Sequence, residues 1–148
     1  MKGLVAILFV ALSGASLPAR ADAGHGAIGR AGDPGKVDRV IHIVASEFRF
    51  SPARVSVKRG QTIRFVVSNE GKLAHEMMLG TMAELNEHAA LMRRFPNMEH
   101  DEPNQVSVAP GATGEIVWRF TRSGVVDFAC LIPGHMEAGM AGAVKVRK

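Results

Sequence analysis

Residues 128–140 of this chain read FACLIPGHMEAGM, and this stretch carries the most information about the fold. It contains the only cysteine of the chain, Cys130, followed by His135 and Met140 with four residues in each gap. A thiolate, an imidazole and a thioether on one short loop supply most of a ligand set for a soft metal ion. A lone buried cysteine usually serves as a small apolar side chain. The spacing to a histidine and a methionine instead favours a metal site.

A fourth ligand must come from elsewhere in the chain, and His75 is the natural candidate. One cysteine, two histidines and one methionine form the ligand set of a blue-copper centre, in which the thioether is a weak axial ligand. Zinc binds cysteine and histidine but rarely methionine, and an iron–sulfur cluster needs several cysteines. The sequence therefore predicts one copper ion per chain, bound by His75, Cys130, His135 and Met140.

The N-terminal segment predicts export. Residues 1–21 combine a basic start at Lys2, an apolar stretch at 4–12 and a small-x-small sequence at 19–21, as secretory signal peptides do. The apolar stretch is too short to span a bilayer. We therefore expect a soluble periplasmic protein with no membrane association. That compartment is oxidising, yet the single cysteine has no partner in the chain, as expected of a metal ligand.

Charge and length place the remaining residues in one domain. Cleavage removes Lys2 and Arg20 and leaves 16 basic against 14 acidic residues, a net charge of +2 that is too weak to indicate a nucleic-acid partner. Residues 22–39 are rich in glycine and alanine and predict a flexible leader. Residues 40–148 are long enough for one domain with its own core, and we expect a monomer.

Most of this domain reads as short strands separated by turn residues. In one of them Ile116, Trp118 and Phe120 alternate with Glu115, Val117 and Arg119, as in a strand with one buried face. The predicted strands are 40–45, 54–58, 62–68, 76–79, 105–108, 114–121, 125–130 and 142–147. Many short strands with regular turns indicate an all-β fold built as a β-sandwich. A sandwich can hold two loops at one end in a fixed relation, which suits a metal site.

One segment breaks the strand pattern and predicts an inserted helix. Thr81 and Glu84 have the spacing of a capping box at a helix N-terminus. Apolar residues follow near helical spacing as far as residue 94, and Pro96 ends the segment.

These motifs resemble the cupredoxins, the family of plastocyanin, azurin and rusticyanin. The resemblance covers roughly residues 40–148 and is strongest at residues 128–140. The segment VSVKRGQTIRFVVSN at 55–69 is similar to the early strand pair of the family, and LAHEMML at 73–79 contains the upstream histidine. The resemblance implies a cupredoxin-like Greek-key β-sandwich with one inserted helix.

Carried over motif by motif, the resemblance implies a type 1 copper site formed by His75, Cys130, His135 and Met140. In the family the second histidine, here His135, typically reaches the surface and passes electrons. The resemblance thus implies that a redox protein partner docks near His135. Among cupredoxins, the chain looks most similar to small periplasmic copper-tolerance proteins.

One position departs from the pattern of plastocyanin and azurin. There an asparagine commonly follows the first histidine and ties the two ligand loops together, but this chain has Glu76. A carboxylate at this position could lower the reduction potential, bind elsewhere or face solvent. Facing solvent is the simplest interpretation, and it leaves the hydrogen bond between the loops in question.

The neighbours of the cysteine argue against catalysis. In multicopper oxidases and copper nitrite reductases, a histidine beside the cysteine connects the site to a second copper. Here the neighbours are Ala129 and Leu131, and no His-x-His pair occurs in the sequence. We therefore expect a copper protein that is not an enzyme.

Further methionines and histidines lie between His75 and Gln105 and leave a second, weak Cu(I) site open. They are Met77, Met78, Met82, His88, Met92, Met98 and His100. Methionine also fills irregular cores, so packing is the competing interpretation. His25 in the leader could chelate copper, whereas His42 is expected on the outer face of its strand.

Two functions agree with these features. The first is copper handling in periplasmic copper tolerance, which the methionine-containing insert favours. The alternative is a one-electron carrier between periplasmic redox partners, because a closed cage of cysteine, histidine and methionine rearranges little when copper changes its oxidation state.

Overall fold

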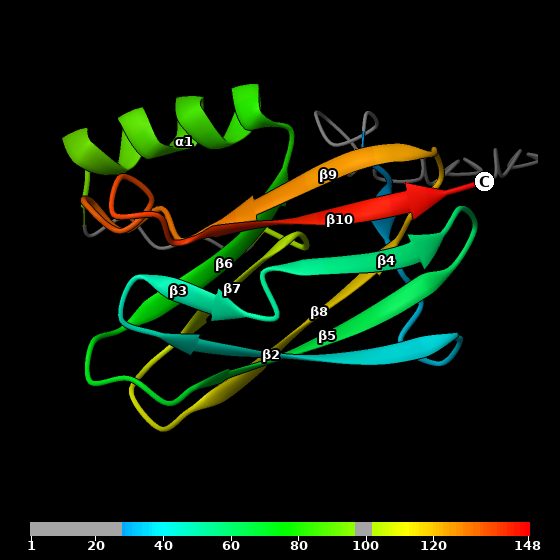
Figure 1. The fold of residues 1–148 in the computed structure, drawn as a ribbon, viewed down its shortest axis with the longest axis horizontal. Coiled ribbons are helices and arrows are strands. Elements are labelled where there is room, and N and C mark those ends of the chain that lie inside the picture. The colour runs from blue at the N-terminus through cyan, green and yellow to red at the C-terminus, as the bar shows by residue number, and fades with distance from the viewer. Residues whose placement is uncertain (1–27, 97–101) are drawn as a thin grey trace, which may run out of the picture.

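The computed structural model describes residues 28–96 and 102–148, and within them two β-sheets pack face to face with one helix at the side (Figure 1). The predicted signal peptide lies outside the described residues, as do His25, Met98 and His100. The expected β-sandwich with one inserted helix is confirmed.

The first sheet contains, in order, β1 (Arg30–Ala31), β8 (Thr113–Arg119), β5 (Thr62–Asn69), β2 (Arg39–Ser46) and β3 (Arg49–Ser51). The second contains β4 (Arg54–Lys58), β10 (Ala141–Arg147), β9 (Gly124–Ala129), β6 (His75–Gly80) and β7 (Gln105–Val108). The eight strands expected from the sequence are all present, and their ends differ from the expected ones by at most two residues. The two-residue β1 and the three-residue β3 were not expected.

The inner faces of the two sheets form one continuous core. The alternation in β8 buries Ile116 and Trp118, and Phe65 of β5 and Phe128 of β9 are also fully buried. Each such side chain contributes roughly 1.5–3 kcal/mol relative to an exposed position. The core therefore holds the strands that lead to the ligand loops.

The segment before β2 packs on the domain over its described part, residues 28–39, where the sequence predicted a flexible leader. Ile28 is 2% exposed, its carbonyl accepts a hydrogen bond from Trp118 Nε1 (3.4 Å), and β1 pairs with β8. A Cβ at Gly29 would lie 2.3 Å from the Arg119 carbonyl oxygen, so only glycine fits this approach. The edge of β8 offers unpaired backbone groups, and this pairing satisfies some of them.

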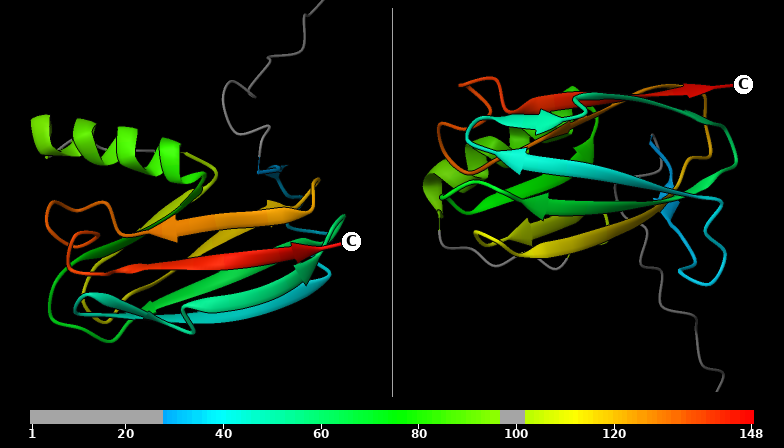
Figure 2. Two further views of the ribbon diagram at one scale, coloured as in Figure 1. Left: turned by 45° about the horizontal axis from the view of Figure 1, so that its top comes forward. Right: turned by 60° about the horizontal axis from the view of Figure 1, so that its bottom comes forward.

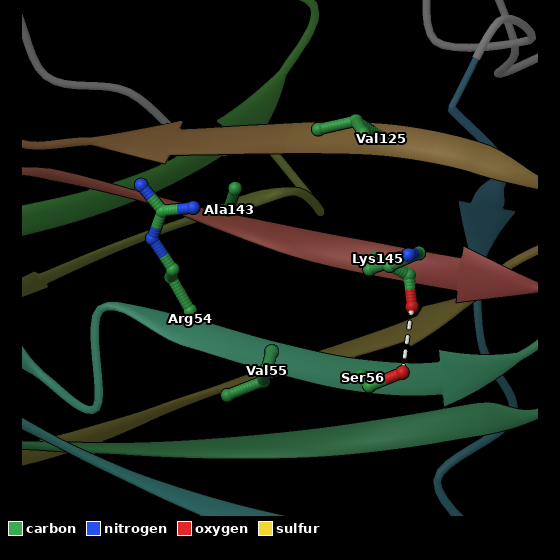
Figure 3. Close-up of a pocket in the computed structure, with 6 residues that line it drawn as sticks. All are labelled: Arg54, Val55, Ser56, Val125, Ala143 and Lys145. Atoms are coloured by element: carbon green, nitrogen blue, oxygen red, sulfur yellow. Dashed lines mark hydrogen bonds between the residues drawn. The ribbon is translucent and has the colours of Figure 1, made fainter.

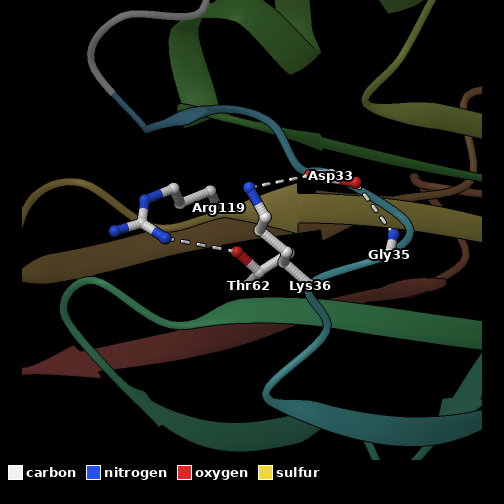
Figure 4. A network of polar contacts seen from close by, with 5 residues as sticks. All are labelled: Asp33, Gly35, Lys36, Thr62 and Arg119. Carbon is white, nitrogen blue, oxygen red and sulfur yellow. Dashed lines mark hydrogen bonds and ion pairs between the residues drawn. The ribbon is translucent and has the colours of Figure 1, made fainter.

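Polar contacts close the turn that follows β1 (Figure 4). The Asp33 carboxylate accepts from the Gly35 backbone N–H at 2.9 Å and forms an ion pair with Lys36 at 3.5 Å. Nearby, Arg119 Nη1 donates to Thr62 Oγ1 at 3.5 Å across β8 and β5.

The helix α1 (Met82–Arg94) begins with the expected capping box. Thr81 Oγ1 accepts from the Glu84 backbone N–H, and the Glu84 carboxylate accepts from the Thr81 backbone N–H. The buried side of α1, formed by Leu85, Ala89 and Met92, packs in one cluster with Met78, Ala129 and Leu131. Figures 1 and 2 show that α1 consequently lies beside the loop between β9 and β10. None of the described helices has the length and hydropathy that a membrane span requires.

Candidate metal centre

The strand pairing brings the four predicted ligands to one end of the sandwich. His75 is the first residue of β6, and Cys130 directly follows β9. Met78 pairs with Ala129 in the antiparallel ladder of these strands. The start of β6 therefore lies beside the end of β9, although His75 and Cys130 are 55 positions apart in the sequence.

Three of the predicted ligands converge in the structure. The candidate ligand atoms of His75, Cys130 and His135 all lie within 4.8 Å of one another, and all three residues are buried. Cys130 Sγ is 3.3 Å from His135 Nδ1, and the two imidazole centroids are 5.1 Å apart. These atoms can share one metal ion after small side-chain adjustments.

Met140 closes the loop at which these ligands meet. Its side chain is fully buried in the same core cluster as Cys130. The Cys130 N–H donates to the Met140 carbonyl at 3.0 Å, and the Met140 N–H donates to the His135 carbonyl at 3.0 Å. The backbone thus holds the methionine next to both the cysteine and the second histidine.

In the metal-free site the ligand groups are uncharged near pH 7. Burial raises the pKa of the Cys130 thiol to about 11, so copper must displace a proton when it binds the sulfur. Burial lowers the pKa of His75, and the neighbouring His135 lowers it further; burial also lowers the pKa of His135. Both imidazoles are therefore neutral near pH 7, which is the form that binds metals.

The buried imidazole of His75 also fits a metal ion. Neither of its ring nitrogens has a hydrogen-bond partner within the described residues. Buried polar atoms are normally paired, because an unpaired one costs free energy. The candidate ligands are one thiolate, two imidazoles and a thioether, and the ring nitrogens of His75 have no other partner among the described residues. This ligand set is the one that copper prefers.

Glu76 does not face solvent, contrary to the simplest expectation from the sequence. Its side chain is 4% exposed, and Oε1 accepts a hydrogen bond from the Leu131 backbone N–H at 3.1 Å. Oε2 accepts from Gln105 Nε2 at 3.2 Å, and the Glu76 N–H points to Cys130 Sγ at 3.5 Å. Glu76 therefore ties the His75 strand to the cysteine loop, which is the connection that the asparagine makes in plastocyanin and azurin.

The turn between β2 and β3 contributes two residues that sequence reasoning missed. The Phe48 ring meets the His135 ring edge-on at 5.3 Å between centroids and is 43% exposed. The Glu47 carboxylate accepts hydrogen bonds from the Lys72 and Leu73 backbone N–H groups, and these bonds lower the pKa of Glu47. Both contacts join segments that are far apart in the sequence, so no local sequence motif could predict them.

Exposed apolar residues lie near His135, which is itself 8% exposed. The Phe48 ring against it is exposed, as are Pro133, Ala138 and Gly139 of the ligand loop, whereas Ile132 and Met136 are half-buried. Glu137 forms an ion pair with Arg93 at 3.2 Å and so connects the loop to α1.

The other candidate copper ligands among the described residues do not all lie together, although Met78 and Met92 share one cluster. Met82 is 46% exposed at the start of α1, while Met92 is 4% exposed near its end. Ten residues of helix separate them by about 15 Å at 1.5 Å per residue. Met77 and Met78 are buried in the core, His88 is half-buried, and His42 is exposed on β2 as expected.

Comparison with known proteins agrees with this site. Residues 37–147 match the copper binding proteins of the plastocyanin/azurin family. The chain is 54% identical over 120 residues to the copper-resistant cuproprotein CopI of Rubrivivax gelatinosus, an alignment that covers 80% of this chain and 73% of that protein. It is 36% identical to CopI of Pseudomonas aeruginosa, covering 95% and 93% of the two chains.

Solved structures show the same fold at lower identity. Auracyanin B superimposes with a TM-score of 0.67 at 19% identity, covering 84% of this chain and 97% of that one. This likeness shows the fold, whereas the match over residues 37–147 and the relatives at 54% and 36% identity establish the family. The chain belongs to the plastocyanin/azurin family of copper-binding proteins, the cupredoxins.

Proposed function

We propose that this chain binds one copper ion at His75, Cys130, His135 and Met140 and serves in periplasmic copper tolerance. The observation that carries the proposal is the convergence of three soft and borderline ligand atoms within 4.8 Å, from β6 and from the loop after β9. Relatives that are 54% and 36% identical are named copper-resistant cuproproteins, which supports tolerance as the role.

The residues of the chain fix the site before any metal arrives. Glu76 holds the first ligand strand against the cysteine loop, and the Met140–Cys130 backbone hydrogen bond closes that loop. Bound copper would supply a one-electron redox couple. His75, Cys130 and Met140 are at most 1% exposed, so these three ligand side chains are shielded from bulk solvent.

Export belongs to the same proposal. Residues 1–21 have the features of a secretory signal, and a tolerance protein in the periplasm would meet copper before it reaches the cytoplasm. The proposal includes no catalytic step, because Ala129 and Leu131 beside Cys130 offer no ligand for a second copper.

Replacement of the thiolate tests the copper site directly. Cys130→Ser is expected to abolish the intense thiolate-to-copper absorption of the oxidised protein. Met82→Leu serves as the matched control, because Met82 is exposed at the far end of α1, and it should retain the colour. A coloured Cys130→Ser protein would contradict the assignment of Cys130.

The apolar surface around His135 favours a second candidate function, electron transfer between periplasmic proteins. Exposed Phe48 and Pro133 would allow weak, brief docking beside a buried redox ligand. A deletion strain separates the two roles when copper sensitivity and respiration are measured side by side. Copper tolerance predicts sensitivity that wild-type protein restores and Cys130→Ser does not, whereas an electron carrier predicts a respiratory defect without added copper.

A further inference from the structure

The predicted copper ligands are so well buried that a copper ion needs a path through the protein to reach them. His75, Cys130 and Met140 are at most 1% exposed, and His135 is 8% exposed with the Phe48 ring against it. Incoming copper must therefore pass between elements that pack tightly.

A cavity of about 390 Å³ reaches the site from the side of α1. It lies between the start of β6, the end of β7, the C-terminal end of α1 and the ligand loop. Its lining includes His75, Glu76, Met92, Ser107 and Ile132. The cavity thus leads from exposed Ser107 to a predicted copper ligand.

Two side chains of this lining suit Cu(I). Met92 offers a thioether and His75 an imidazole, while Ala74, Val108 and Ile132 contribute apolar wall. Thioethers select Cu(I) over harder cations. The two ring nitrogens of His75 have no hydrogen-bond partner within residues 28–96 and 102–148, so this ring is available to a cation.

A second cavity provides the contrast. It has a similar volume of about 370 Å³ and lies on the strands β4, β9 and β10, between Arg54, Val55, Val125 and Lys145 (Figure 3). Its lining contains two cationic side chains and neither thioether nor imidazole. It has no chemistry for a copper ion and serves as a control location.

We propose that the cavity beside α1 is the entry site for Cu(I), where Met92 and His75 bind the ion before Cys130 and His135 complete its coordination. The step is a ligand exchange in which copper stays Cu(I). The Cys130 S–H bond breaks as the S–Cu bond forms, and its proton leaves to solvent. The inference rests on the proposed copper-binding function and adds a route to it.

The test is the rate at which the metal-free full chain takes Cu(I) from a coloured Cu(I) chelator. Met92→Leu keeps the side-chain volume and removes the thioether. We expect uptake to slow by roughly tenfold or more, as loss of one ligand contact in the rate-limiting step would cause. The final copper affinity, and the visible absorption after oxidation, should match wild type because Met92 is not a ligand in the completed site.

Blocking the cavity gives an independent measurement. Ser107→Phe places a ring at the exposed mouth and should slow uptake in the same way. Met82→Leu on the same helix and Val125→Phe at the second cavity are the matched controls, and both should load at the wild-type rate. Far-ultraviolet circular dichroism and the end-point absorption verify that each variant folds.

The outcomes separate the route from the function. Wild-type rates in both Met92→Leu and Ser107→Phe would overturn the entry site. Faster uptake in Phe48→Ala, with Met92→Leu unaffected, would overturn it as well and place entry beside His135. A wild-type chain that takes up copper without coordinating it through Cys130 would instead contradict the proposed function.

Discussion

Among single residues, Glu76 connects the two segments that carry the predicted ligands. Its carboxylate accepts from the Leu131 backbone, one position after the predicted thiolate ligand, and its own backbone N–H contacts the Cys130 sulfur. The resemblance to plastocyanin and azurin implies an uncharged asparagine at this position. Here the connection adds a buried acidic group beside the metal ligands.

Substitutions at Glu76 can separate the effect of its hydrogen bond to Leu131 from the effect of its negative charge. Glu76→Gln keeps an acceptor for the Leu131 N–H, so the visible spectrum should stay close to wild type while the reduction potential rises with the loss of negative charge. Glu76→Ala leaves a buried N–H unpaired, which costs about 1–3 kcal/mol of unfolding free energy, and should alter the spectrum.

Redox titration and visible spectroscopy measure these effects, and urea unfolding measures the stability. Gln105→Ala is the control, because it removes only the hydrogen bond to Oε2. If Glu76→Ala retained the wild-type spectrum and stability, the carboxylate would not be holding the two segments together.

The buried thiol of Cys130 predicts a pH-dependent stability of the metal-free protein. The pKa of the thiol is about 11 in the folded chain against a reference value of 9.0. As pH rises from 9 to 11, the thiol of the unfolded chain ionises first, so unfolding becomes easier. The free energy of unfolding should fall by up to about 2–3 kcal/mol across this window, at 1.36 kcal/mol per pKa unit.

Urea unfolding on either side of this window measures the loss, and Cys130→Ser should reduce it. The chain contains one cysteine and no tyrosine, so ultraviolet thiolate absorption reports the ionisation of Cys130 alone. Thiolate formation near pH 9 in the folded protein would contradict the assigned burial.

At the scale of elements, periodicity and capping signals predicted most of the fold. The alternation in residues 114–121 and the capping box at Thr81 each encode their structure locally, and β8 and α1 form where expected. β1 and β3 are too short to show a period, and they form because neighbouring strand edges accept them. Sequence composition alone gave no sign that Ile28 would be anchored against Trp118.

The metal centre was likewise only partly predictable from the sequence. Cys130, His135 and Met140 lie on one loop, so their spacing was visible in the sequence. The roles of Glu76 and Phe48 depend on contacts across 55 and 87 positions of the chain. Such contacts are set by the packing of the sandwich, so only the folded structure reveals them.

The capping box at Thr81 is expected to contribute to the stability of α1. Thr81→Ala removes the side-chain acceptor for the Glu84 N–H and should cost about 1 kcal/mol of unfolding free energy. Urea unfolding measures this change, and Glu87→Ala, an exposed position on the same helix, should have little effect. An equal loss in both variants would show that the cap contributes nothing specific.

In the molecule as a whole, most of the core between the sheets is formed by residues that are not predicted ligands. Its large aromatic side chains include Phe65, Trp118, Phe120 and Phe128, and of the predicted ligands only Cys130 and Met140 belong to it. Removal of copper with a chelator should therefore leave the far-ultraviolet circular dichroism unchanged. It should nevertheless lower the melting temperature, because a ligand bound only to the folded state stabilises it by about 2.7 kcal/mol at one hundred times its Kd.

Differential scanning calorimetry of the copper-loaded and metal-free protein measures this difference. Cys130→Ser provides the control, because added copper should shift its melting temperature much less. Loss of the sheet signal on copper removal would mean that the fold itself depends on the metal.

The position of β10 has a consequence for the order in which the protein matures. β10 lies between β4 and β9 in the second sheet, yet it follows every other strand in the sequence. A nascent chain emerges from its N-terminus, so the place between β4 and β9 stays open until the residues of β10 have been made. Cys130, His135 and Met140 immediately precede that strand, and their loop closes only when β10 pairs with β9. A complete copper site therefore requires β10 as well as the ligand loop, and a chain that stops before this strand is expected not to retain the metal.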